Sequence, residues 1–241
     1  MNISEESIIG ELVAQDYRTA SIFKEMGIDF CCNGNRSIAD ACSAKSINTQ
    51  TLILSLKEVS NLQNNSTTDY TNWPLDLLAD YIEKKHHRYV RTKTQEILPY
   101  LNKIVKVHGD RHSELLEVEK LFQESCNDLA EHMVKEEQIL FPHIRSMVEA
   151  NELGQSIKAP FGTVHNPIKM MMHEHDTEGR RFEKIAELTD DYTPPIDACN
   201  TYRITFALLK EFEQDLHLHI HLENNILFPK SIKAEENLLT I

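Results

Sequence analysis

Glycine and proline are scarce in this sequence, which contains 7 and 8 of them among 241 residues. Average usage of the two residues together is about twice as high, at roughly 12%. Architectures made of short strands and tight turns need more of both residues at their turns. The scarcity therefore predicts long helices with few tight turns, and a hydrophobic content of 41% is sufficient for a packed core.

Positive charge is also scarce. Lys and Arg number 25 against 38 Asp and Glu, which gives a formal net charge of −13. Nucleic acids and anionic membrane surfaces are polyanions, and they attract basic proteins. The charge balance therefore argues against both as the main partner.

The sequence has no long apolar run and no pattern typical of secretion. Its longest stretch without a charged residue extends only from Ser46 to Leu56, whereas a membrane-spanning helix needs about 20 residues. The first residues include two early glutamates and no apolar core of signal-peptide length. The 5 cysteines, an odd number at uneven spacing, do not form a disulfide framework. We therefore expect a cytoplasmic protein whose thiols stay reduced.

Polarity divides the chain into three parts. Residues 61–72 are polar and carry one charge, so they are predicted to be a linker. Residues 1–60 predict a small helical domain, and residues 73–241 contain long helical patterns. These patterns cover 72–107, 113–149, 166–189 and a last stretch from Pro194–Pro195 to about Phe228–Pro229. The expected fold class is all-α, an up-down-up-down four-helix bundle preceded by the small helical domain.

An internal repeat joins a histidine to a glutamate in two of the predicted helices. The segment from His132 to Pro142 recurs from His219 to Pro229, and both copies have the form H-x-x-x-E-x-x-I-L-F-P. The histidine and the glutamate are four residues apart, so they lie on one helical face. Burying a glutamate costs free energy unless the carboxylate is paired or bound to a metal. The presence of two such glutamates therefore requires an explanation.

The other two predicted helices each carry a histidine at a matching spacing. His87 lies 45 residues before His132, and His175 lies 44 residues before His219. His175 lies on an apolar stripe, whereas helical phase alone barely separates His87 from the adjacent His86. Imidazoles and carboxylates that meet in a bundle core are a ligand set for two metal ions. The predicted ligands are His87, His132, Glu136, His175, His219 and Glu223.

The duplication favours metal binding over simpler interpretations. A single histidine on an apolar face is more often a satisfied core residue, and a His/Glu pair can be a surface contact. Imidazole and carboxylate ligands without thiolate suit iron or manganese better than zinc. If both glutamates bridge, an oxide bridge gives each iron about five ligands and leaves a position for O₂ or NO. A structural or zinc-storage bundle is the alternative that remains open.

The remaining histidines receive no specific role. His108 shares the stripe of His87 but lies 21 residues further on, about 31 Å along an unbroken helix. It is therefore expected outside the site, although Pro99 permits a kink.

The paired motifs and the N-terminal segment together resemble a known family. The repeated H-x-x-x-E in a four-helix bundle is similar to the hemerythrin-like fold. The segment Asp29-Phe30-Cys31-Cys32-Asn33-Gly34 resembles the start of the iron–sulfur cluster repair di-iron proteins, the RIC family. The resemblance extends over nearly the whole chain and selects His87 over His86. It implies iron ligation by His87, His132, His175 and His219, with Glu136 and Glu223 as bridges.

The resemblance also implies a function. It implies a non-haem protein with two oxo-bridged iron ions that repairs iron–sulfur clusters after nitrosative or oxidative stress. Damaged iron–sulfur proteins would be its partners, and NO or O₂ its small ligands. Iron donation, NO removal and NO reduction all remain open as the repair step, and a repair protein is expected rather than a conventional enzyme. The alternative is a reversible carrier or sensor of O₂ or NO, as in plain hemerythrins, which leaves the N-terminal cysteines without a purpose.

Two adjacent cysteines, Cys31 and Cys32, are the candidate catalytic residues. By chemistry alone, reactive thiols and small buried residues are equally good interpretations. Adjacent cysteines rarely form a strainless disulfide, and two thiols do not complete a metal site. The Asn33–Gly34 turn predicts that both are accessible, and the resemblance favours reactive thiols that supply iron transfer or electrons to the di-iron site. The other cysteines, Cys42, Cys126 and Cys199, are expected to be structural.

Overall fold

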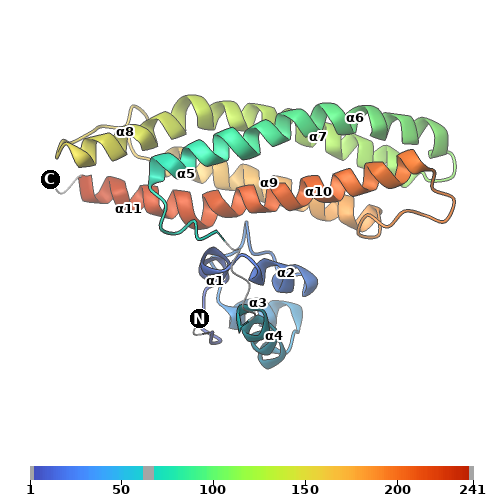
Figure 1. Ribbon diagram of the computed structural model, residues 1–241, viewed down its shortest axis with the longest axis horizontal. Helices are drawn as coiled ribbons and strands as arrows, with labels where there is room; N and C mark the ends of the chain where they lie inside the picture. Colours follow the sequence, from blue (N-terminus) through green and yellow to red (C-terminus); the bar gives the residue numbers. More distant parts are fainter. Residues whose placement is uncertain (1–2, 62–67, 239–241) are drawn as a thin grey trace.

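The computed structural model describes residues 3–61 and 68–238. These residues form helices and no β-strand. Figure 1 shows a long helical bundle with a small helical unit packed against the middle of one side. The predicted all-α fold, a four-helix bundle behind a small helical N-terminal unit, is confirmed. Among the described residues, none of the helices has the length and apolar character needed to cross a membrane.

The N-terminal unit consists of short helices around its own apolar core. Phe23 and Leu52 are fully buried in it. Gly27, at φ +64°, follows α2 in the left-handed conformation that glycine tolerates best. The Oγ atom of Ser37 accepts a hydrogen bond from the Asp40 N–H at 3.1 Å, which caps α3. The helices are α1 (Ile9–Gln15), α2 (Thr19–Glu25), α3 (Ile38–Lys45) and α4 (Thr49–Asn61).

Three of the four rods of the bundle are interrupted by one wide, π-helical turn, and the third rod is a single helix. The first rod is α5 (Leu75–Tyr81), η1 (Ile82–His87) and α6 (Arg88–His108). The second is α7 (Glu114–Lys135), η2 (Glu136–Leu140) and α8 (Phe141–Glu152), and the third is α9 (His165–Leu188). The fourth is α10 (Asn200–Leu222), η3 (Glu223–Leu227) and α11 (Phe228–Leu238).

The fourth rod does not end at Phe228–Pro229, so that prediction is wrong. It continues through α11 to Leu238. Proline lacks an N–H and clashes with the carbonyl four residues earlier in a regular helix. Pro142 and Pro229 both follow a π-helical turn, where the backbone is wider. The wide turns therefore let both helices continue past a residue that normally ends them.

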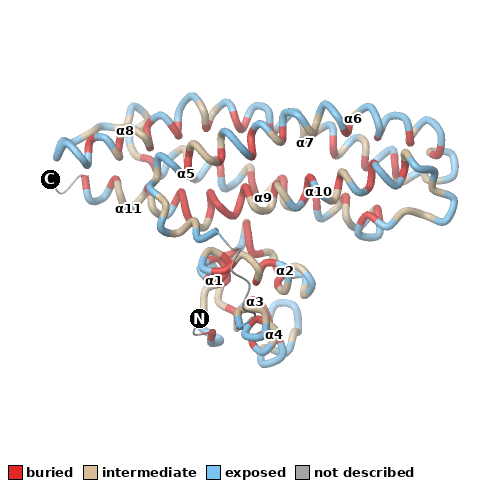
Figure 2. Tube along the Cα trace, in the orientation of Figure 1, coloured by how far each residue is buried: buried red, intermediate tan, exposed pale blue. Residues whose placement is uncertain are grey.

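The apolar core of the bundle is divided into two clusters. Figure 2 shows buried residues along the facing sides of the rods. One cluster includes Phe122, Phe182 and Phe212, and it is continuous with the core of the N-terminal unit. The other cluster, at the opposite end, includes Phe141 and Phe228. Buried polar side chains occupy the level between them, so the sequence places its functional residues where the apolar core is interrupted.

The N-terminal unit docks on the fourth rod through α1 and the loop that follows α2. Helix α1 contacts α10 and η3. Lys24 forms an ion pair with buried Glu213 at 2.5 Å. Gly10 and Gly34 allow a close approach, because a Cβ atom at either position would lie under 3.0 Å from the side chain of Asn225. The predicted domain limits at residues 60 and 73 stay predictions, and residues 62–67 of the predicted linker lie outside the described residues.

Candidate metal centre

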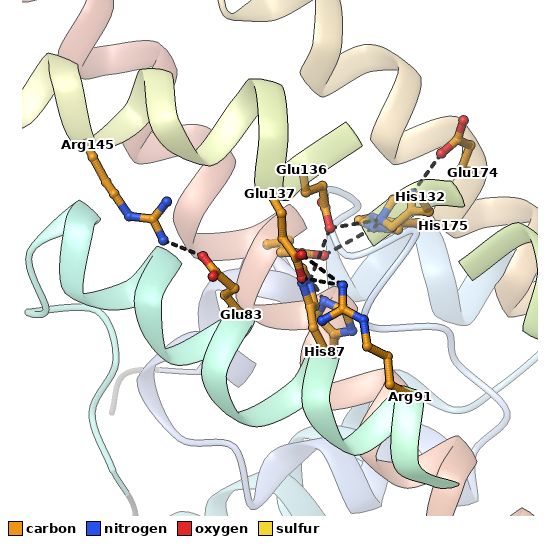
Figure 3. A network of polar contacts seen from close by, with 11 residues as sticks. Glu83, His87, Arg91, His132, Glu136, Glu137, Arg145, Glu174 and His175 are labelled. Carbon is orange, nitrogen blue, oxygen red and sulfur yellow. Dashed lines mark hydrogen bonds and ion pairs between the residues drawn. The ribbon is translucent and has the colours of Figure 1, made fainter. Parts of the chain in front are cut away.

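The six predicted ligands all lie at the level that separates the two apolar clusters. Each is buried, and the wide turns place several of them, since η1 ends at one ligand and η2 and η3 each begin at another. Figure 3 shows the side chains of His87, His132, Glu136 and His175 pointing toward one another. The structure assigns the residues to rods as follows: His87 to the first, His132 and Glu136 to the second, His175 to the third, and His219 and Glu223 to the fourth.

The six side chains form two overlapping groups that share both glutamates. Within each group, the possible ligand atoms lie within 4.8 Å of one another. One group, called the 87/219 half below, is His87, Glu136, His219 and Glu223. The other, the 132/175 half, is His132, Glu136, His175 and Glu223. An arrangement of two shared carboxylates and two separate imidazole pairs is suited to binding two cations side by side.

The 132/175 half brings two imidazole nitrogens unusually close. His132 Nε2 and His175 Nε2 are 3.0 Å apart. The Nδ1 atom of His132 faces a carboxylate oxygen of Glu174 at 2.7 Å, and that of His175 faces the amide oxygen of Asn224 at 2.8 Å. Because both oxygens can only accept, each Nδ1 carries the proton. In the neutral rings, both Nε2 lone pairs therefore point at the same small space, which a cation would stabilise.

Within the described parts of the chain, several buried polar atoms of the site make only histidine–carboxylate contacts at 3.2–3.3 Å or none, and no well-aligned hydrogen bond. They are His87 Nε2, both carboxylate oxygens of Glu136, His219 Nδ1 and Glu223 Oε2. Buried polar atoms are normally satisfied, and two carboxylates in a dry interior need positive charge nearby. The donor set of nitrogen and oxygen atoms therefore fits a pair of metal ions.

The pKa values of the site histidines shift in opposite directions, because the two glutamates raise them and burial lowers them. Burial lowers the pKa of His132, but Glu136 and Glu174 outweigh this and raise it to about 10. At His87, burial is likewise outweighed, chiefly by the Glu136 carboxylate 3.3 Å from Nε2, so the pKa is raised. Burial lowers the pKa of His219 despite the nearby Glu223. Without a metal, protons on two of the histidines thus neutralise the carboxylates.

Three of the four histidines are held from behind by a second side chain. Besides the contacts of His132 and His175, His87 Nδ1 lies 2.7 Å from Glu137 Oε1. Arg91 binds the same carboxylate at 2.8 Å, as Figure 3 shows, and Lys135 pairs with Glu174. Such partners fix the tautomer and the orientation of a metal-binding imidazole. They leave Nε2, the atom that faces the centre, as the atom that would lose its proton and bind a metal.

The sequence reasoning missed these outer partners, although the repeat contains a signal for two of them. Glu137 follows Glu136 in the first copy, and Asn224 follows Glu223 in the second. Each holds the histidine of the preceding rod. The residue after the glutamate of the repeat therefore contacts Nδ1 of a histidine in both halves. No pattern in the sequence indicates the corresponding contact of Glu174.

The structure separates the adjacent histidines of the first rod. His86 is buried outside both groups: its Nδ1 lies 3.0 Å from Asp215 Oδ2, and its ring stacks on His219 at 5.6 Å. His108 lies outside the site, as expected, with Nε2 at 3.3 Å from Cys199 Sγ. Helix α6 runs through Pro99 without interruption. Only His87 of this rod therefore contributes to the centre.

The two candidate catalytic cysteines lie in the docking loop between α2 and α3. Cys32 is half-buried, and its thiol donates to the backbone oxygen of His175 at 3.4 Å. Cys31 is buried with 4% exposure, and Asn224 Nδ2 donates to its carbonyl oxygen at 3.0 Å. The prediction that both thiols are accessible is therefore wrong for Cys31, because the turn faces the bundle. Asn224 thus touches both a predicted ligand and this loop.

Two protein families match consecutive parts of the chain. The ScdA_N family, described as a domain of unknown function (DUF542), matches residues 5–60. The family described as "Hemerythrin HHE cation binding domain" matches residues 79–231. The second match covers more than half of the chain and includes all six predicted ligands.

The chain is also similar to curated proteins over nearly its full length. It is 34% identical to the iron-sulfur cluster repair protein ScdA of Staphylococcus haemolyticus, over 95% of this chain and 99% of that protein. It is 34% identical to the iron-sulfur cluster repair protein YtfE of Musicola paradisiaca, over 95% and 98%. The YtfE protein of Pectobacterium atrosepticum is 35% identical over 94% and 97%. The resemblance expected from the motifs is confirmed.

Proposed function

This chain belongs to the family of iron–sulfur cluster repair proteins that combine an ScdA_N and a hemerythrin-type domain, and from that membership we propose that it repairs iron–sulfur clusters damaged by nitrosative or oxidative stress. Damaged iron–sulfur proteins are then its partners, in the cytoplasm. The names of its relatives and the buried ligand set support this function.

We place two non-haem iron ions in the centre. Glu136 and Glu223 would be shared by both ions, His87 and His219 would hold one ion, and His132 and His175 would hold the other. The observation that carries this assignment is the convergence of six buried nitrogen and oxygen ligands in two groups that share both carboxylates. When bound, an oxo-bridged iron pair would supply redox chemistry and an open position for NO or O₂.

The chain's own residues orient and isolate this site. Glu174, Glu137 and Asn224 keep a proton on Nδ1 of their histidines, so that Nε2 would be the atom that binds a metal. The two apolar clusters exclude water from both ends. Cys31 and Cys32 act in repair as reactive thiols beside His175, and the domain limits that we propose are 1–60, 61–72 for the linker and 73–241.

Metal analysis tests the centre. The untagged protein, purified without added metal, should contain about two irons per chain and show the absorption of an oxo-bridged pair. Zinc alone would refute the di-iron assignment and favour a structural or zinc-storage bundle.

A repair assay tests the function. The iron-loaded protein should restore activity to an enzyme whose [4Fe–4S] cluster has been damaged by NO. Reversible binding of NO or O₂ without repair would support the alternative, a carrier or sensor of the hemerythrin type. Replacing Cys31 and Cys32 together by serine should spare iron binding and abolish repair, whereas the matched change of Cys126 and Cys199 should leave repair intact. Unchanged repair in the first variant would remove the thiols from the mechanism.

A further inference from the structure

Three side chains that can bind a metal meet in the docking loop, outside the six-ligand centre. The ligand atoms of Asp29, Cys31 and Cys32 lie within 4.8 Å of one another. The two sulfur atoms are 3.7 Å apart, and Asp29 Oδ1 lies 3.4 Å from Cys31 Sγ. All five cysteines of the chain are free thiols, so both sulfur atoms are available.

The loop is built around the carboxylate. Asp29 Oδ1 accepts the backbone N–H of Cys31 at 3.0 Å and that of Cys32 at 2.9 Å. Asn33 Nδ2 donates to the other oxygen at 2.6 Å. These bonds turn the backbone around Asp29 and bring both sulfur atoms near it. The three groups are therefore arranged before any ligand arrives, which reduces the ordering that binding requires.

The cluster lies between a cavity and the helix of a predicted iron ligand. A cavity of about 680 Å³ is lined by Asp29 and Cys31 on the loop and by Asp176, Gly179 and Glu213 on the bundle. The basic side chains of Lys24, Arg36, Lys45 and Arg180 also line it. On the other side, Cys32 Sγ contacts the backbone oxygen of His175 at 3.4 Å. A Cβ atom at Gly179 would lie 3.1 Å from the same sulfur. The small residue at 179 thus leaves room for Cys32 beside the helix.

We propose that Asp29, Cys31 and Cys32 form a third metal site that binds a thiophilic divalent cation, and that ferrous iron passes through it between the cavity and the six-ligand centre. The second part rests on the proposed function. As the metal–sulfur bonds form, each thiol releases its proton to solvent, and no electron is transferred. Solvent fills the fourth position.

The ligand chemistry of the cluster favours the passage of a metal ion over its long-term storage. Two thiolates and a carboxylate are soft enough for Fe²⁺, Co²⁺ or Zn²⁺. Three protein ligands leave one position open, which permits exchange, whereas closed sites have four. Contact with Cys32, burial and the Asp29 carboxylate raise the pKa of Cys31, so the thiol form prevails until a cation displaces the proton.

Cobalt binding tests the site. The full-length protein, with iron already in the six-ligand centre, is titrated with Co²⁺ under anaerobic conditions. Thiolate-to-cobalt charge-transfer absorption should report about one additional ion per chain. The protein used in this titration also carries the C126S and C199S substitutions. Cys199 Sγ lies 3.3 Å from His108 Nε2, and this thiol–imidazole pair could otherwise compete for the cation.

Single replacements locate the bound ion. C31S and C32S should each abolish or shift the band. D29N should weaken Co²⁺ binding by roughly tenfold or more, while its amide oxygen still accepts the loop N–H groups. Circular dichroism should verify that each variant remains folded. If C31S does not fold, C32S and D29N provide the test.

The outcomes separate this site from the proposed function. Absence of the band, or a band that survives in both C31S and C32S, would overturn the third site even if repair of the damaged cluster were normal. A band that depends on the loop residues, together with failed repair, would leave the site in place and overturn the transit role with the proposed function.

Discussion

The 87/219 and 132/175 halves of the centre share their carboxylates but hold their histidines differently. In the 132/175 half, each imidazole donates to an acceptor behind it. In the 87/219 half, His87 has such a partner, whereas His219 Nδ1 has none among the described residues. We therefore expect two metal positions of unequal strength, with the 87/219 half weaker.

The internal repeat explains where the inequality comes from. Glu174 immediately precedes His175 and binds His132, the histidine of the neighbouring rod. The equivalent residue before His87 is His86, which stacks on His219 rather than donating or accepting a hydrogen bond with it. A carboxylate raises the basicity of the imidazole that it holds, and a stacked ring does not. The repeat thus preserves the ligands while the residues behind them differ.

Glu136 belongs to both halves, so its replacement should have the largest effect. E136Q keeps the shape and removes the charge, and we expect a loss of affinity greater than about 100-fold, because a bridging ligand is worth more than an outer partner. Metal analysis after desalting should give less than about one ion per chain. E149Q, the same change at an exposed position, is the control. Two retained ions in E136Q would show that this carboxylate does not bridge.

Removing Glu174 should make the two halves alike. The protein should lose its metals to a chelator in two phases, the faster from the 87/219 half. E174Q should speed the slower phase by roughly 10–100-fold. H86Q, at the equivalent position of the repeat, should change either rate by less than about twofold. Release in a single phase from the unmodified protein would contradict the inequality.

Asn224 offers a smaller and more selective test, since its amide has two roles. N224D retains an acceptor for His175 but cannot donate to the Cys31 carbonyl, whereas N224A loses both contacts. We expect N224A to speed metal release from the 132/175 half by about tenfold and N224D to leave it nearly unchanged. Both variants should expose Cys31 to a thiol reagent faster. Equal metal loss in the two variants would refute the role assigned to the acceptor.

A further prediction concerns the stability of the metal-free protein. His132 has a pKa raised to about 10 from 6.5, so the folded protein retains a proton that the unfolded chain releases. This stabilisation is complete below about pH 6.5 and is lost as the pH rises to about 10. His219 behaves oppositely, because burial lowers its pKa and protonation below pH 6.5 favours unfolding.

Urea denaturation of the chelated protein between pH 6.5 and 10 measures this contribution. The midpoint should fall with rising pH, and E174Q should reduce the slope, because Glu174 helps to hold the proton. The same slope in both proteins would remove His132 as its source.

Much of the fold and the centre could be predicted, because both depend on regular spacing. Residues four apart share a helical face whatever the rest of the chain does, so the repeat identified the residues that the structure brings together. The continuation past Pro229 could not be read in this way. It depends on a π-helical turn, which is a departure from the very periodicity used for the prediction.

Contacts between distant segments were harder to predict. Glu174 looks like any helical glutamate in the sequence, and only the packing of α9 against α7 gives it a partner. The Asn33–Gly34 turn was expected to face solvent, but the bundle binds this loop through Asn224 and Asn225. Burial of Cys31 follows from that docking rather than from its neighbours in the chain.

The divided core has a consequence for the lifetime of the protein. The level between the two apolar clusters contains charged groups, so cations bound there would contribute directly to the stability of the folded bundle. We therefore expect a metal-free chain to open more often than a loaded one, and opening exposes the backbone to proteases. Cellular degradation would therefore remove metal-free molecules first and spare loaded ones.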